Sequence, residues 1–171
     1  MWNLIFSSLY FFLPAYCANM APILFRWLPW GKKPIWEKKL GDHKTWRGLV
    51  VGIIFGTLIF LLQKWFHTLG FQQWSLIDYP DYSLLLGVLL SSGALAGDLI
   101  KSYYKRKAEI KPGERWFPWD QLDFFFGALT LSFIVYVPRP EVVLILFVVS
   151  PILHFLANAL GYWLKINKKI W

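Results

Sequence analysis

The stretch that decides the fold is Leu95–Asp123, LAGDLIKSYYKRKAEIKPGERWFPWDQLD. It begins inside an apolar segment, passes through a basic loop, and enters apolar sequence again after its last residue. The carboxylates of Asp98, Asp120 and Asp123 therefore lie at the ends of two apolar segments. Carboxylates are costly to place at membrane depth, so we interpret these three as part of a functional site. Beside a cluster of cations, they indicate a divalent metal ion that holds a polyphosphate.

The composition is that of an integral membrane protein, because 57% of the 171 residues are hydrophobic and only 16% are charged. Soluble domains average about 25% charged residues. The net charge of +8 would also suit a nucleic-acid-binding protein. However, the basic residues cluster in the gaps between apolar segments, which is typical of a membrane surface and of anionic substrates. We therefore expect one membrane domain over residues 1–171, within a lipid bilayer and without a nucleic-acid partner. The lone Cys17 excludes a disulfide within the chain.

Five apolar segments predict an all-α protein with five transmembrane helices, since a span needs about 20 apolar residues. The N-terminal segment lacks a basic region before its apolar run, so we interpret it as a retained helix and not as a signal peptide. The predicted spans cover about 2–20, 49–69, 83–100, 122–137 and 142–164, and the main loops between them are 26–48 and 101–121.

Small and helix-breaking residues predict local features of the first two spans. Pro14 removes one backbone hydrogen bond and should kink the first helix, whereas Asn19 and Pro22 should break or restart it near its inner end. Gly52 and Gly56 give the second span a face of small residues that favours close packing against a neighbouring helix.

The basic residues also predict the orientation of the chain. Of the 18 lysines and arginines, seven lie in the loop 26–48, six in the loop 101–121 and three in the C-terminal tail after residue 164. Only Lys64 and Arg139 remain for the opposite side of the membrane. The positive-inside rule then places both loops and the C-terminus in the cytoplasm and the N-terminus outside. We therefore expect a multi-pass protein of the cell membrane with its active site on the cytoplasmic side.

The spacing within the central stretch predicts which side chains share a face. If the helix that contains Asp98 continues past it, Ser102 and Lys105 follow at i+4 and i+7 on the same face. Pro118 favours a helix start, which would place two carboxylates one turn apart near the positive end of the next helix. Three carboxylates from two helices suit Mg²⁺, which completes its coordination with water and phosphate oxygens. Aspartates at helix ends also act as simple caps, and basic loops often only fix topology, an interpretation that we prefer for Lys107.

Two motifs in these regions are similar to the signature of the phosphatidate cytidylyltransferase superfamily. That signature reads S-x-x-K-R-x4-K-D followed by D-R-x-D, with a K-T-x-x-G run before a long span. The matching residues are Gly97-Asp98, Ser102-Tyr-Tyr-Lys105-Arg106, Lys111, Asp120-Gln-Leu-Asp123 and Lys44-Thr45-Trp46-Arg47-Gly48.

The chain departs from the bacterial pattern in ways that resemble the archaeal branch, the CDP-archaeol synthases. Pro112 replaces an aspartate, Gln121 replaces an arginine, and Arg47 stands where glutamate is common. The segment RWFPW also replaces a His-Gly-Gly stretch. The short length, the predicted spans and the N-terminal run PAYCANMAP are similar to that branch as well, so the resemblance covers essentially the whole chain.

The resemblance implies transfer of CMP from CTP to an isoprenoid ether lipid, 2,3-bis-O-geranylgeranylglycerol 1-phosphate, with release of pyrophosphate and with Mg²⁺ as cofactor. It implies that Asp98, Asp120 and Asp123 bind the metal and, with Lys105, carry the catalysis. The predicted substrate contacts are Lys44, Thr45, Arg47, Ser102, Arg106 and Lys111, together with Asn19 near the lipid headgroup.

Two other functions remain open at this point, and so does the oligomeric state. A CTP-dependent lipid kinase would transfer the γ-phosphate and release CDP, whereas a cytidylyltransferase releases pyrophosphate. A small cation transporter would also contain intramembrane aspartates, but it would place them near the midplane of the membrane. In this sequence all three lie at one predicted cytoplasmic end, beside a basic loop.

Overall fold

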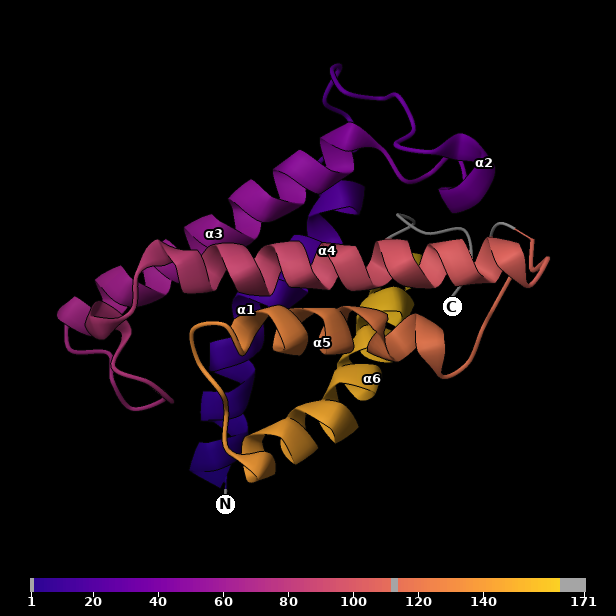
Figure 1. Ribbon diagram of the computed structural model, residues 1–171. Coiled ribbons are helices and arrows are strands. Elements are labelled where there is room, and N and C mark those ends of the chain that lie inside the picture. Colours follow the sequence, from indigo (N-terminus) through magenta and orange to yellow (C-terminus); the bar gives the residue numbers. More distant parts are fainter. Residues whose placement is uncertain (1, 112–113, 164–171) are drawn as a thin grey trace.

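The computed structural model describes residues 2–111 and 114–163, and in these ranges the chain is helical, with a single isolated bridge between Pro34 and Thr45 (Figure 1). The predicted cytoplasmic tail therefore lies outside the described residues, as does Pro112. The elements are α1 (Trp2–Leu24), α2 (Glu37–Leu40), α3 (Trp46–Thr68), the 3₁₀ turn η1 (Tyr79–Asp81), α4 (Leu84–Lys107), α5 (Trp119–Ser132) and α6 (Pro140–Trp163).

Within the described residues, four helices are long and apolar enough to cross a membrane, namely α1, α3, α4 and α6. The protein is therefore a multi-pass membrane protein, but a fifth full-length span is not among them. The span predicted at 122–137 corresponds to α5, which has 14 residues and ends at Ser132. At about 1.5 Å per residue its length is roughly 21 Å, less than the roughly 30 Å of a hydrocarbon core. Conversely, α4 extends about two turns beyond its predicted end at Ile100.

Helix α1 continues through both of its prolines, so the prediction that Asn19 and Pro22 break the helix is wrong. A proline in a helix leaves the carbonyl four residues earlier without its usual donor. At Pro14 that carbonyl belongs to Tyr10, and it accepts a hydrogen bond from the side-chain amide of the buried Gln63 on α3. A neighbouring helix therefore supplies the missing donor, which allows the helix to continue at membrane depth.

The predicted small-residue face of α3 is confirmed, because it packs between α1 and α4. A Cβ added to Gly52 would lie 2.7 Å from a methyl group of Leu95 on α4 and 2.9 Å from the carbonyl oxygen of Ala18 on α1. One turn along α3, a Cβ added to Gly56 would collide with the Ser91 side chain. Only a helix without side chains at these positions can approach both neighbours so closely.

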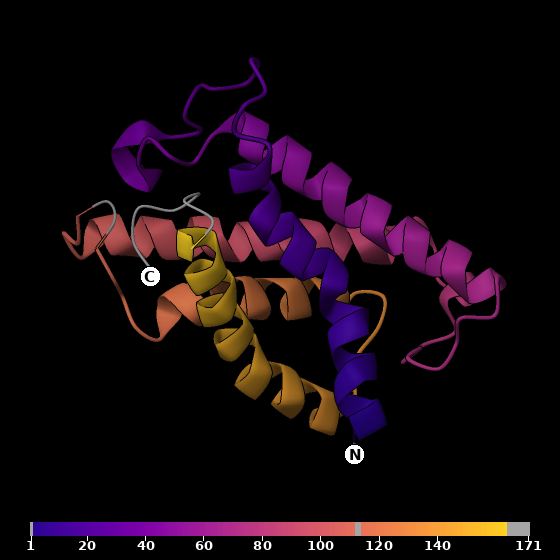
Figure 2. The ribbon, with the colours of Figure 1, turned by 180° about the vertical axis from the view of Figure 1, so that it is seen from behind.

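Helix α5 runs antiparallel to α4 along a second seam of glycines, and the two helices lie side by side in Figure 1. A Cβ at Gly97 would collide with the backbone carbonyl of Asp123, and a Cβ at Gly93 would collide with that of Gly127. The absence of side chains on α4 thus brings the backbone of α5 into contact with it next to Asp98. Figure 2 shows α1 and α6 on the same side of this helix pair. Phe11 and Phe12 of α1 and Val142 and Leu146 of α6 belong to the buried core.

Candidate active site

The candidate site is built around the ammonium group of Lys101, which contacts three carboxylates from two helices. Its Nζ lies 3.3 Å from Asp98 Oδ1, 3.1 Å from Asp120 Oδ1 and 3.0 Å from Asp123 Oδ2. The lysine and Asp98 lie one turn apart on α4, and the other two aspartates lie one turn apart on α5. The glycine seam between these helices therefore brings together the three carboxylates that the sequence singled out.

Two further lysines contact this cluster from outside. Lys44 pairs with Asp98, and Lys105 donates to both carboxylate oxygens of Asp120, at 2.9 and 2.8 Å. The backbone N–H of Trp116 also donates to Asp120 Oδ2, at 2.6 Å. These N–H donors and the ammonium of Lys101 therefore compensate the negative charge of Asp120.

The loop between α1 and α3 places Lys44 in this cluster because it folds back on itself. The backbone N–H of Ile35 donates to the carbonyl of Lys44, at 2.7 Å. The next residue, Thr45, caps α3, since its hydroxyl oxygen accepts from the N–H of Gly48 at 3.2 Å. Two predicted substrate contacts thus follow directly from the position where α3 begins.

A polar cavity of about 790 Å³ opens beside the carboxylates, and it is large enough for a nucleotide. Six basic side chains line it, as do two of the three aspartates. Of the predicted site residues, the cavity brings together Asn19, Lys44, Thr45, Arg47, Asp98, Lys105 and Asp120.

Arg47 also makes a structural contact, because its Nη1 donates to the carbonyl of Leu28 at 2.6 Å. A smaller cavity of about 160 Å³ continues from Lys44 to Ser102 and Arg106. The hydroxyl of Ser102 donates to the backbone carbonyl of Asp98, at 2.7 Å, so its hydrogen is used within α4. Ser102 and Arg106 therefore lie at the margin of the candidate site.

Lys111 is the one predicted site residue that contacts none of the described cavities. It is exposed in the loop after α4, and its backbone N–H donates to Glu114 Oε2 at 2.9 Å. Its predicted contact with substrate is thus not part of this arrangement.

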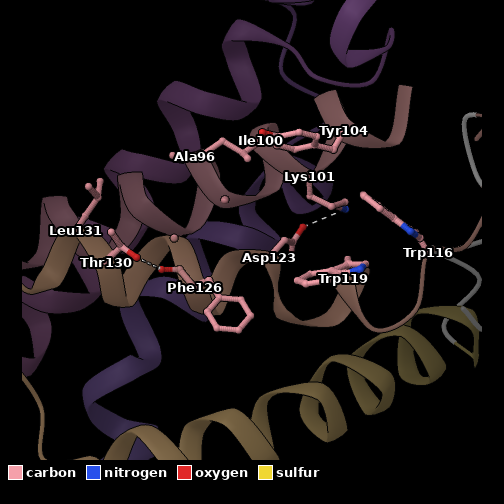
Figure 3. A pocket seen from close by; sticks show the side chains of 12 residues that line it. Ala96, Ile100, Lys101, Tyr104, Trp116, Trp119, Asp123, Phe126, Thr130 and Leu131 are labelled. Atoms are coloured by element: carbon pink, nitrogen blue, oxygen red, sulfur yellow. Dashed lines mark hydrogen bonds and ion pairs between the residues drawn. The ribbon is translucent and has the colours of Figure 1, made fainter. Parts of the chain in front are cut away.

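An apolar groove of about 530 Å³ lies on the other side of the carboxylates, between α4 and α5. In Figure 3 the Lys101 and Asp123 side chains meet within it, beside the rings of Trp116 and Trp119. The groove then continues along the helices past Phe126. Since Lys101 also lines the polar cavity, the cluster of charges separates an apolar space from a polar one.

A second apolar groove, of about 390 Å³, lies between α1 and α6. It shares Asn19 and His154 with the polar cavity. The ring of His154 packs near Phe124, with centroids 6.0 Å apart, and its buried Nδ1 has no hydrogen-bond partner among the described residues. The position of His154 at the cavity could not be inferred from the sequence, because α6 lies far from the motifs.

The carboxylates fit a hard divalent cation, since Mg²⁺ prefers oxygen ligands and is commonly held by one or two carboxylates and by phosphate oxygens. Within the described residues, however, no group of three or more His, Cys, Asp or Glu side chains is already arranged around a metal position. The three carboxylates are instead arranged around the ammonium of Lys101. Lys101 was not among the site residues predicted from the sequence, although its position three residues after Asp98 places it on the same helix face.

Comparisons with known proteins agree on one family. The family described as CarS-like CDP-archaeol synthase matches residues 1–171. The CDP-archaeol synthase of Pyrococcus furiosus is 36% identical over 178 aligned positions that cover 98% of each chain. That of Thermococcus kodakarensis is 38% identical, over 92% of this chain and 91% of the relative. A solved structure of an intramembrane enzyme for archaeal membrane lipid biosynthesis matches with a TM-score of 0.67 and 29% identity, over 88% of this chain and 92% of the other.

Proposed function

Because the chain belongs to the CDP-archaeol synthase family, we propose that it transfers CMP from CTP to the phosphate of an isoprenoid ether lipid and releases pyrophosphate. The acceptor that we propose is 2,3-bis-O-geranylgeranylglycerol 1-phosphate. One observation carries this assignment: a polar cavity and an apolar groove share Lys101, at a cluster of three carboxylates. Such a site can receive a water-soluble polyphosphate from one side and a lipid phosphate from the other.

We place CTP in the polar cavity, because several basic side chains there can neutralise its phosphates. Lys44, at the start of α3, and Lys105, on α4, reach this cavity from two different elements. Arg47 can form two parallel hydrogen bonds to a phosphate, in addition to its contact with the loop. Cations held in place by the fold stabilise charge that develops on transferring phosphoryl groups.

The chemistry requires little acid or base catalysis. An oxygen of the lipid phosphate, already anionic, attacks the α-phosphorus of CTP and forms a new P–O bond. The bond from the α-phosphorus to the bridging oxygen breaks, and pyrophosphate leaves with the electron pair. The main difficulty is to align two anions, so the contribution of the protein is positioning and charge neutralisation.

We propose that Asp98, Asp120 and Asp123 hold Mg²⁺, which supplies positive charge to the phosphates when it is bound. Lys44 would then hold the outer oxygen of Asp98, and Lys105 would hold both oxygens of Asp120, so that the two lysines fix the orientation of these carboxylates. Ligand orientation by such outer partners is typical of metal sites.

The lipid chains would enter sideways from the bilayer along the groove between α4 and α5. Ile100 and Phe126 offer apolar surface there, and the groove ends at Lys101 and Asp123. Because each isoprenoid unit contributes only apolar burial, we expect the protein to discriminate weakly between chains of different length or saturation.

We further propose that the chain crosses the membrane five times, with α5 as a short fifth crossing, the N-terminus outside and the C-terminus in the cytoplasm. The antiparallel alignment of α4 and α5 supports this topology. So does the clustering of basic residues in the loops that surround the polar cavity, which would then face the cytoplasm of the cell.

Product analysis in detergent micelles tests the proposed reaction. Purified protein is supplied with labelled CTP, Mg²⁺ and either the geranylgeranyl ether phosphate or ordinary phosphatidic acid. We expect pyrophosphate and a CMP-bearing lipid, formed faster with the ether lipid. Release of CDP with a lipid that has gained one phosphate would identify a kinase. If folded protein turns over no nucleotide with either lipid, a transporter becomes the better hypothesis.

A further inference from the structure

We propose that Lys101 acts as a built-in counter-ion that holds the three carboxylates together in the metal-free protein and moves to a substrate phosphate when a divalent cation binds. This inference rests on the metal site proposed above. It assigns a positioning role to a residue that lies between Asp98 and Ser102 and is not itself one of the matching motif residues.

The contacts of Lys101 are those expected for a group that takes the place of a metal ion. A lysine ammonium has three N–H donors and no acceptor. Its Nζ lies between 3.0 and 3.3 Å from one oxygen of each of Asp98, Asp120 and Asp123. Each of the three N–H groups of Lys101 can therefore donate a hydrogen bond to one carboxylate. Mg²⁺ binds its oxygen ligands at about 2.0–2.1 Å, so a cation at this position would need each carboxylate to move inward by only about 1 Å.

The other two lysines of the cluster cannot fill this role. Among the described residues, Lys44 forms an ion pair only with Asp98, and Lys105 only with Asp120. Both can stay in place while a cation enters between the carboxylates. Lys101 cannot, because its side chain is only 15% exposed and its ammonium lies where the cation would bind. Two cations so close together in a largely buried site repel each other strongly.

The structure also provides a place for the displaced ammonium. Lys101 lines both the polar cavity and the apolar groove, and its four-carbon stem allows the ammonium to turn to either side. In Figure 3 its side chain lies at the end of the groove, next to Trp116 and Asp123. An anionic lipid phosphate that arrives along the groove would therefore meet this ammonium. Metal binding and phosphate binding should then favour each other, because the phosphate gives Lys101 a new partner.

The test measures Mn²⁺ binding by electron paramagnetic resonance in detergent, without nucleotide or lipid, so that it does not depend on activity. Lys101→Met keeps the length of the side chain and removes the charge. Since no ammonium then competes, we expect Mn²⁺ to bind about tenfold or more tightly than to the unmodified protein, a change of the size seen when groups around a metal site are altered. Without metal, the variant should also melt at a lower temperature and regain stability with Mn²⁺, because its buried carboxylates repel one another.

Three companion variants make the result specific. Lys101→Arg retains a cation and should keep the weaker binding of the unmodified protein. Lys107→Met removes an exposed charge two turns along α4, and it should leave Mn²⁺ affinity unchanged. Adding Asp123→Asn to Lys101→Met should abolish the gain, since the tighter site requires that carboxylate.

Equal or weaker Mn²⁺ binding by Lys101→Met would overturn the inference. If neither protein binds Mn²⁺ but CMP transfer still requires Mg²⁺, the counter-ion role fails while the proposed function stands. If Lys101→Met binds Mn²⁺ more tightly but no form of the protein makes a CMP-bearing lipid, the counter-ion role stands and the proposed reaction fails.

Discussion

The polar cavity and the apolar groove between α4 and α5 differ in chemistry but meet at the same charges. The cavity, of about 790 Å³, is lined by basic side chains from several elements. The groove, of about 530 Å³, is lined mainly by apolar side chains from two helices. Lys101 belongs to both. A reaction centre on this boundary lets a nucleotide and a lipid meet while the nucleotide stays in an aqueous cavity and the lipid chains stay in apolar surroundings.

The cavity and the groove also differ in how the buried carboxylates between them are compensated. Buried carboxylates are costly unless cations and hydrogen bonds compensate them. On the cavity side Lys44 and Lys105 provide this compensation. On the groove side the partners of Asp123 among the described residues are Lys101 and the N–H of Phe124, which donates at 2.7 Å. The groove side of the cluster is therefore the more sensitive to the loss of one partner.

Asp123→Asn should have the largest effect, because it alters the carboxylate that lines the groove. We expect CMP transfer to fall about 100-fold or more, the size of effect seen when one charge-stabilising group is lost from an active site. The assay measures the CMP-bearing lipid at saturating CTP and lipid.

Asp78→Asn is the matched control, since Asp78 is an exposed carboxylate that pairs with His67 at the other end of α3. It should leave the transfer rate unchanged. Normal turnover by correctly folded Asp123→Asn protein would contradict the proposed metal site and would leave the cavity and the groove without a shared reaction centre.

Much of this site could be predicted from the sequence, because it depends on short spacings. Asp120 and Asp123 are separated by one helical turn, and Asp98 follows a glycine that permits close helix contact. The central role of Lys101 was missed. Its position relative to Asp98 is visible in the sequence, but the approach of α5 that brings two more carboxylates to it is a tertiary contact.

The predicted helices differ from the observed ones for the same reason, namely contacts between residues that are not visible in a local sequence pattern. Apolar residues continue past Ser132, so hydropathy predicts a longer fifth span. The chain instead turns there, and the N–H of Tyr136 donates to the carbonyl of Ser132 at 2.8 Å. Pro22 predicts a break in α1, yet the helix continues while it packs against α3. The turn after Ser132 depends on a hydrogen bond between backbone groups, and the course of α1 at Pro22 depends on the close approach of Gly48 on α3. A pattern of side chains along the sequence reveals neither contact.

A bulky side chain in the groove between α4 and α5 should have an intermediate effect. It should weaken lipid binding and leave nucleotide binding unchanged. Thr130 is exposed and lines the groove on α5, so Thr130→Trp should fill part of it. We expect the KM for the lipid to rise about tenfold while the KM for CTP stays the same, because uniform substrate binding is lost on one side only. Initial rates over a matrix of both substrate concentrations measure the two constants.

Leu156→Trp is the matched control, because it fills the second apolar groove, between α1 and α6, to a similar extent. It should leave both constants unchanged if the lipid uses the groove between α4 and α5. The reverse pattern, with a raised lipid KM in Leu156→Trp alone, would move the lipid to the second groove, beside His154.

Lys111→Met should have the smallest effect, although Lys111 belongs to the sequence motif. The side chain is exposed outside the cavities, and charges in such positions are screened by water and salt. We expect the KM for CTP to change by less than about twofold at physiological ionic strength. Lys44→Met, which removes a cation within the cavity, should raise it far more. An equal loss in both variants would mean that Lys111 contacts the bound nucleotide, as the sequence motif predicts.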